Sequence, residues 1–145
     1  NEGEVLELSR DELELGYRTS CIPDRGYTVL EAAFWLEPGD RAAIEARMKE
    51  LAARRREKQP LEYPSAGSTF KRPEGHFAGK LIMDAGLRGY RVGNAQVSEK
   101  HCGFVINLGG ATAKDVYQLM QDVGRIVKEK YQIELEPEVK MLGKF

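Results

Sequence analysis

A capped amphipathic helix in the last third of the sequence constrains the fold of this chain more than any other segment. Thr112 is followed three positions later by Asp115, which is the spacing of a capping box, so the sequence predicts a helix from there to about residue 130. Apolar residues recur on one face of that helix, and we expect this face to be buried: Val116, Leu119, Met120, Val123 and Val127.

Two further helices are predicted earlier in the chain. Asp40 can cap a helix over residues 41–57. One face of this helix is apolar and consists of Ile44, Met48, Leu51 and Ala52. A short helix is predicted over residues 77–85, because Gly86 stands just past its end, where glycine often terminates a helix.

Extended segments alternate with these helices. Residues 4–8 are predicted to form a short strand, and residues 27–37, rich in aromatic and β-branched side chains, a stronger one. Residues 59–76 are predicted to form a long loop. The remaining extended segments are two strands at residues 89–98 and 103–108, joined by a turn, and stretches at 132–135 and 138–142 around Pro137. This mixture predicts the α+β class rather than a doubly wound sheet.

Composition excludes several classes of function. The chain has 145 residues, and its 22 basic and 23 acidic residues nearly cancel, which disfavours a general nucleic-acid binder. No apolar run approaches the roughly 20 residues of a membrane span. The sequence starts without Met and without an apolar signal core, so we expect a fragment or a processed product. We interpret Cys21 and Cys102 as reduced thiols of a cytoplasmic protein.

Familiar catalytic and metal motifs are incomplete. Residues 75–80 miss the phosphate-loop pattern because three residues separate the glycines where four are needed, and Leu81 replaces the Ser or Thr that would bind magnesium. Ser68 lacks the serine-hydrolase elbow because Phe70 occupies the last glycine position. The histidines and cysteines are not spaced as metal ligands, so no metal site is predicted.

The most informative stretch is residues 64–73, Pro-Ser-Ala-Gly-Ser-Thr-Phe-Lys-Arg-Pro. Prolines limit backbone freedom at both ends, and Gly67 permits a conformation that other residues resist. Lys71 and Arg72 would favour a nearby anion. The stretch can present one hydroxyl, that of Ser68, or it can be purely structural, and the local residues leave both interpretations open.

Three other groups also have two interpretations. Arg18 can clamp a carboxylate or can be a surface cation. Glu138 can be a functional carboxyl or an exposed strand residue. The cations of residues 54–58 suit the negative end of a helix dipole and can be no more than a solvated helix end.

Taken together, these stretches resemble the C-terminal part of one family, the UDP-N-acetylenolpyruvoylglucosamine reductases. The similarity covers essentially the whole chain, and it is the combination of motifs in the right order that is specific. The motifs occupy residues 16–20 (Gly-Tyr-Arg-Thr-Ser), 58–60 (Lys-Gln-Pro), 64–73, 79–82 (Gly-Lys-Leu-Ile), 103–107 (Gly-Phe-Val-Ile-Asn) and 135–140 (Leu-Glu-Pro-Glu-Val-Lys).

The resemblance implies a flavoenzyme that uses NADPH and FAD to reduce UDP-N-acetylglucosamine enolpyruvate to UDP-N-acetylmuramic acid for peptidoglycan. The family's catalytic arginine, serine and glutamate fall on Arg18, Ser68 and Glu138. The cations and the histidine that it places near the UDP part of the substrate fall on Lys58, Lys71, Arg72 and His101, and Arg55 can supply another positive charge. Arg72 departs from the Asn found in some members.

The resemblance also implies a division of the chain. Residues 1–37 would be the tail of the FAD-binding domain, and residues 38–145 the substrate-binding domain, of the subgroup that lacks a tyrosine-bearing loop after Leu36. The N-terminal FAD-binding lobe with its phosphate loop would be missing, so we expect this chain to be inactive and weak in FAD binding by itself. The alternative is a non-catalytic module that binds a UDP-sugar or another partner.

Overall fold

The computed structural model describes residues 3–143. Its backbone contacts divide the chain into two compact units, Asn1–Gly39 and Asp40–Phe145, which are described separately below. Residues 1–2 of the first predicted domain and residues 144–145 of the second lie outside the described part. The division falls two residues after the predicted boundary at residues 37 and 38, and the assignment of the parts to a flavin domain and a substrate domain stays a prediction.

The first unit is built around one short helix, α1 (Cys21–Asp24), which the sequence analysis missed. Ser20 caps it by accepting a hydrogen bond from the Ile22 N–H, and the Cys21 side chain is buried. Cys21 is tied to the preceding loop because its N–H donates to the carbonyl of Leu13.

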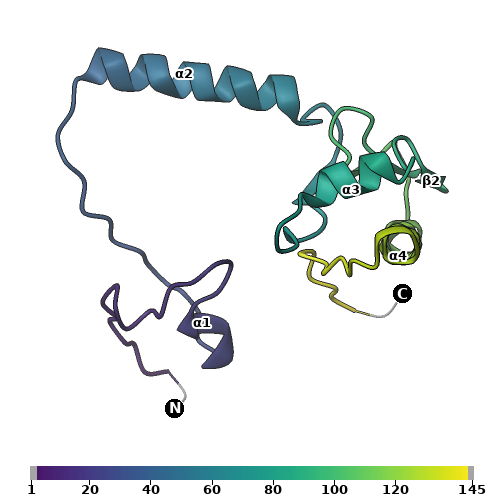
Figure 1. Ribbon diagram of the computed structural model, residues 1–145. Helices are drawn as coiled ribbons and strands as arrows, with labels where there is room; N and C mark the ends of the chain where they lie inside the picture. Colours follow the sequence, from purple (N-terminus) through teal and green to yellow (C-terminus); the bar gives the residue numbers. More distant parts are fainter. Residues whose placement is uncertain (1–2, 144–145) are drawn as a thin grey trace. The chain divides into compact units, whose positions relative to one another are not determined.

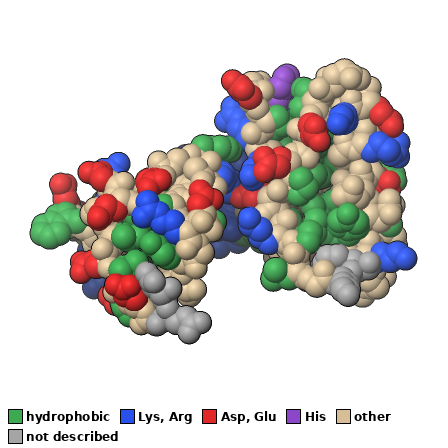
Figure 2. Space-filling model, turned by 90° about the horizontal axis from the view of Figure 1, so that it is seen from below, with side chains coloured by type: hydrophobic (Ala, Val, Ile, Leu, Met, Phe, Trp, Pro, Cys, Tyr) green, Lys and Arg blue, Asp and Glu red, His purple; other side chains and the backbone are tan. Residues whose placement is uncertain are grey.

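The predicted strands at residues 4–8 and 27–37 are wrong, because both segments are irregular. A strand needs a neighbour for its N–H and C=O groups, and no described segment pairs with either of them. The strand-like side chains of the second segment are instead exposed, with Trp35 98% and Phe34 81% accessible. Figure 2 shows hydrophobic side chains at the surface among charged ones.

The second unit contains a four-stranded antiparallel sheet in the order β1-β4-β3-β2. Its strands are β1 (Ser65–Ser68), β2 (Arg91–Val92), β3 (Ala95–Val97) and β4 (Phe104–Asn107). The predicted strand at residues 103–108 is confirmed. Residues 89–98 form a tight hairpin rather than one strand, because Gly93 turns the chain with a positive φ of 54°. The predicted loop at residues 59–76 was also partly wrong, since it contains β1.

Three helices complete this unit: α2 (Arg41–Lys58), α3 (Ala78–Asp84) and α4 (Ala113–Tyr131) (Figure 1). The two predicted caps are confirmed, because Asp40 accepts from the Ala43 N–H and Thr112 forms a capping box with Asp115. The apolar face predicted for the first of these helices exists but is exposed, since no residue of α2 is buried. The segments at 132–135 and 138–142 are not strands; the isolated bridge in this part of the chain joins Pro137, which lies between them, to Phe70.

The core lies between α4 and the sheet. Four of the five apolar residues predicted for the buried face of α4 are buried, and Val116 is partly buried. The helix contacts β2, β3 and α3. Together these elements confirm the α+β class. None of the helices in the described range has the length and apolarity needed to span a membrane.

Truncation of the α4 face should destabilise the second unit. Leu119 is fully buried, so Leu119→Ala leaves a cavity and is expected to lower the free energy of unfolding by about 3 kcal/mol. Urea unfolding followed by circular dichroism at 222 nm measures the loss. Leu142→Ala is the matched control, because Leu142 is 84% exposed. Equal stability of the two variants would contradict this packing.

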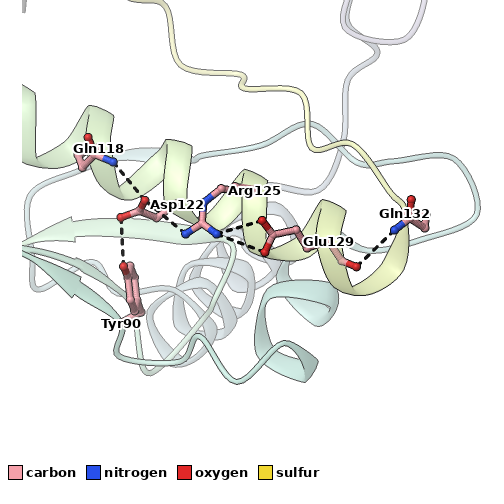
Figure 3. A network of polar contacts seen from close by, with 6 residues as sticks. All are labelled: Tyr90, Gln118, Asp122, Arg125, Glu129 and Gln132. Carbon is pink, nitrogen blue, oxygen red and sulfur yellow. Dashed lines mark hydrogen bonds and ion pairs between the residues drawn. The ribbon is translucent and has the colours of Figure 1, made fainter.

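A polar network ties the outer side of α4 to the sheet (Figure 3). Tyr90 follows the turn after α3, and its hydroxyl donates to Asp122 Oδ2 at 3.1 Å. Gln118 Nε2 donates to the other carboxylate oxygen, Asp122 Oδ1, at 3.1 Å. Arg125 pairs with Glu129 on the next turn. The hydrogen bond to Asp122, together with burial, raises the pKa of Tyr90.

The raised pKa of Tyr90 predicts a pH-dependent contribution to stability. The folded state favours the neutral phenol, so the contribution is complete below the unfolded tyrosine pKa of about 10 and is lost as the pH rises through the higher folded value. We expect the difference in unfolding free energy between the wild-type chain and Tyr90→Phe to be constant from pH 7 to 9 and to shrink above pH 10. Urea titrations at each pH measure it. A difference that does not change with pH would contradict the assignment.

Candidate active site

The segment that carries Ser68 lies between two backbone neighbours. On one side β1 pairs with β4, with Ser68 opposite Phe104. Past the end of β1, the Thr69 carbonyl accepts the N–H of Glu138 at 2.9 Å, and the Lys71 N–H donates to the Glu136 carbonyl at 2.8 Å. Ser68 and Glu138, far apart in the sequence, are therefore carried by directly hydrogen-bonded segments.

The exposure of Ser68 follows from its neighbours in the strand. The ladder with β4 shifts register between Ser65 and Ser68, and Gly67 adopts a φ of 89° there. Such an irregularity re-aims the side chains that follow it. Thr69 is 3% exposed, and its Oγ1 accepts the Val105 N–H at 3.0 Å. Because Thr69 and Phe70 are anchored in the interior, Ser68 is left facing solvent.

Glu138 is half-buried, and its Oε2 atom has essentially no solvent exposure. The preceding residue, Pro137, makes the bridge to Phe70. Two successive backbone contacts thus fix the Glu138 backbone beside the Ser68 segment. A carboxyl whose backbone is held this way can act from a fixed position.

His101 lies in the turn between β3 and β4. The Ser98 hydroxyl is buried and accepts the N–H groups of Lys100 and His101, each at 3.2 Å. The His101 Nδ1 atom accepts the Gly103 N–H at 3.1 Å, which leaves Nε2 as the nitrogen that can donate to a ligand. The His101 ring packs edge-on against Phe104, the residue paired with Ser68, at 5.0 Å between centroids.

Glycine at position 103 allows this arrangement. A Cβ atom added to Gly103 would lie 2.9 Å from the His101 ring, and one added to Gly79 of α3 would lie 3.1 Å from the Gly103 nitrogen. The α3 helix, the turn and the imidazole therefore pack closely.

Three of the four predicted cations of the second unit, Lys71, Arg72 and Arg55, already make contacts with neighbouring side chains. Lys71 forms an ion pair with Glu136. The Arg72 guanidinium stacks on the Phe77 ring at 4.0 Å. Arg55 donates to Gln59 Oε1 at 3.1 Å, and Lys58 is the last residue of α2. Each of these cations keeps solvent exposure, so each can still meet an anionic ligand.

Arg18 belongs to the first unit and is described within it alone. It lies in a tight turn closed by two backbone hydrogen bonds between Gly16 and Thr19. Its φ of 58° is in the left-handed region, which is uncommon for a non-glycine residue and is often found at functional sites. The guanidinium carbon lies 6.0 Å from the centre of the Tyr17 ring. Its role as a partner of Ser68 and Glu138 stays a prediction.

The family model of the C-terminal domain of UDP-N-acetylenolpyruvoylglucosamine reductase matches residues 59–142. The chain belongs to the UDP-N-acetylenolpyruvoylglucosamine reductase family. The matched stretch contains five of the predicted site residues of the reductase: Ser68, Lys71, Arg72, His101 and Glu138.

Known reductases of this name are similar along nearly the whole chain. The protein from Lachnoclostridium phytofermentans is 66% identical over 98% of this chain, and that from Agathobacter rectalis is 62% identical over 99%. A crystal structure of the reductase from Thermus caldophilus matches 88% of this chain with 40% identity and a TM-score of 0.72. Each match covers 46% of the relative, so the chain spans about half the length of the reductases it matches.

The family assignment confirms the resemblance seen in the sequence.

Sequence reasoning missed two residues, Thr69 and Lys100, that hold the segments of the predicted site residues in place. Thr69 orients the Ser68 segment, and its signal was its position inside the motif at residues 64–73. Lys100 links α2 to the His101 turn, and nothing in the spacing of the reductase motifs points to it. Within the described residues, no group of three His, Cys, Asp or Glu side chains is placed to hold a metal ion.

Proposed function

We propose that this chain supplies the substrate-binding and proton-donating half of a UDP-N-acetylenolpyruvoylglucosamine reductase. The reaction adds one hydride and one proton across the enolpyruvyl double bond of UDP-N-acetylglucosamine enolpyruvate. The product is UDP-N-acetylmuramic acid, which is used for peptidoglycan. The observation that carries the proposal is the hydrogen bond between the Thr69 carbonyl and the Glu138 N–H, which joins the segments of two predicted catalytic residues.

FAD, reduced by NADPH, would supply the hydride that adds to C3 of the enolpyruvyl group. The charge pushed onto C2 and the neighbouring carboxylate would then need fixed donors. A phosphate-binding loop for FAD is not among the motifs of this chain, so we assign that loop to the other half of the reductase.

Three residues of this chain would handle the charge and the proton. Arg18 would hold the substrate carboxylate with its planar guanidinium. A neutral Glu138 would donate a hydrogen bond to the same group, which its half-buried position supports. Ser68 would deliver the proton to C2 from the side opposite the hydride, and these two additions would saturate the double bond. Its exposure on β1 supports access to substrate.

The UDP part of the substrate would meet the remaining predicted residues. Lys58 and Arg72 are the preferred ligands of the diphosphate, with Lys71 and Arg55 as further cations, and His101 would donate through Nε2. All five lie in the unit Asp40–Phe145. We place the activity in the cytoplasm, and the two buried free thiols, Cys21 and Cys102, support a reducing compartment.

A chimera tests this proposal directly. In the reductase chimera, this chain replaces the matching 142 residues of the Lachnoclostridium phytofermentans protein. We expect NADPH oxidation that depends on UDP-N-acetylglucosamine enolpyruvate, and no such turnover and only weak FAD binding by this chain alone. A folded, FAD-loaded chimera that binds the substrate without oxidising NADPH would instead favour a non-catalytic UDP-sugar-binding module.

A further inference from the structure

One lysine joins two segments that carry predicted substrate ligands. Lys100 Nζ, at the turn between β3 and β4, donates to the backbone carbonyl of Arg56 in the last turn of α2 at 2.7 Å. The same ammonium pairs with Glu62 at 3.4 Å. The contact thus connects the end of α2, with Arg55 and Lys58, to the turn that holds His101.

The Arg56 carbonyl needs this donor because of the residue that follows the helix. In a continuing helix the Arg56 carbonyl would accept a hydrogen bond from the N–H of the residue four positions later. That residue is Pro60, which has no N–H. The helix ends at Lys58, and the N–H of the C-cap residue Gln59 still reaches the Arg55 carbonyl at 2.9 Å. Lys100 therefore satisfies a carbonyl that the local sequence leaves open, at the helix end where a cation is favoured.

Lys100 is itself held in place at its backbone and at its ammonium group. The buried Ser98 hydroxyl accepts the Lys100 N–H and fixes its backbone. Glu62 holds the head group, and its pKa is lowered first by a hydrogen bond from its own backbone and then by Lys100. Lys100 is 35% exposed and Glu62 is 54% exposed, so the energy of the pair is modest, and its effect is geometric.

We propose that Lys100 is a positioning residue that fixes the end of α2, with Lys58 and Arg55, relative to His101, and so sets the spacing of the ligands for the UDP diphosphate. The inference rests on the proposed reductase function. Diphosphate recognition depends on cations held at a fixed separation, and a frayed last turn of α2 would hold Lys58 at no fixed distance from the imidazole.

The test compares Lys100→Met with Lys114→Met in the reductase chimera. Lys114 is exposed in the first turn of α4, so its replacement by Met removes the same charge from another helix. For Lys100→Met we expect amide hydrogen exchange over residues 55–63 to rise about tenfold and the KM for the substrate and the Kd for UDP to rise about tenfold, with kcat within twofold. Lys100→Arg, which keeps a donor for the carbonyl, should restore KM to within about threefold of wild type.

Glu62→Ala separates positioning from direct phosphate contact. If Lys100 acts by position, loss of Glu62 loosens the ammonium and raises both the exchange rate and KM. If Lys100 binds phosphate itself, the same variant frees the ammonium, and KM falls or stays constant; that result would overturn the proposal. Unchanged exchange in Lys100→Met, or faster exchange with unchanged KM and Kd, would overturn it as well.

The two proposals fail in different ways. A wild-type chimera that neither oxidises NADPH with the substrate nor binds UDP would refute the reductase function. The exchange experiment reports on the contact of Lys100 with α2 in either case, because it needs no turnover.

Discussion

Replacing Ser68 by Ala in the reductase chimera is expected to lower kcat for NADPH oxidation by about 10³- to 10⁴-fold. A positioned proton donor contributes up to about this factor to a reaction that ends in protonation of carbon. The KM for UDP-N-acetylglucosamine enolpyruvate should change less than about threefold, because the proposed diphosphate ligands are elsewhere and Ser68 is exposed on β1. Steady-state kinetics at saturating NADPH measure both constants.

Ser65→Ala is the matched control for this prediction. Ser65 lies on the same strand, and its hydroxyl accepts the N–H of the nearby Gly67 at 3.2 Å. We expect its kcat to stay within about threefold of wild type. Turnover of Ser68→Ala equal to wild type would remove the proton-donor role. A parallel loss in substrate affinity would instead assign Ser68 to binding.

A flavin measurement refines the Ser68 prediction. If the lesion affects only the protonation step, reduction of bound FAD by NADPH in Ser68→Ala should keep its wild-type rate, since in the proposed reaction the flavin is reduced before it passes hydride to the enolpyruvyl group. Stopped-flow absorbance at 450 nm measures it. Slow flavin reduction would show that the substitution disturbs more than a proton donor.

The elements that sequence predicted well are those whose determinants are local. The capping box of α4 lies within four residues, and its apolar face follows from helical spacing alone. The Asp40 cap of α2 and the Gly86 stop after α3 are equally short-range signals. The family was recognisable for another reason, because its motifs keep their order along the chain.

The elements that sequence predicted badly depend on partners elsewhere. Residues 27–37 have the composition of a strand but no described segment beside them, so composition could not decide their structure. The strand β1 was hidden in a proline-bracketed loop, because its pairing with β4 is a long-range contact. The contact between the Thr69 carbonyl and the Glu138 N–H was invisible for the same reason.

Replacing Glu138 should separate its two possible protonation roles. As a neutral hydrogen-bond donor to the developing enolate, Glu138 would stabilise charge in the way of an oxyanion-hole donor, and removal of such a donor costs about 10²- to 10³-fold in kcat. We therefore expect this loss for Glu138→Ala in the reductase chimera. Glu138→Gln should lose only about tenfold, because its amide N–H can replace the carboxyl proton donor at the same position.

The comparison of the two variants carries the argument. The backbone contact of Glu138 with Thr69 does not involve the side chain, so both variants should keep the two segments hydrogen-bonded beside Ser68. Circular dichroism and FAD content check that both fold. If Glu138 worked as a charged base, Gln would be as damaging as Ala, because an amide cannot accept a proton at neutral pH. Equal losses in the two variants would therefore exclude the neutral-donor role, whereas a graded loss fits a carboxyl whose Oε2 lies in the interior.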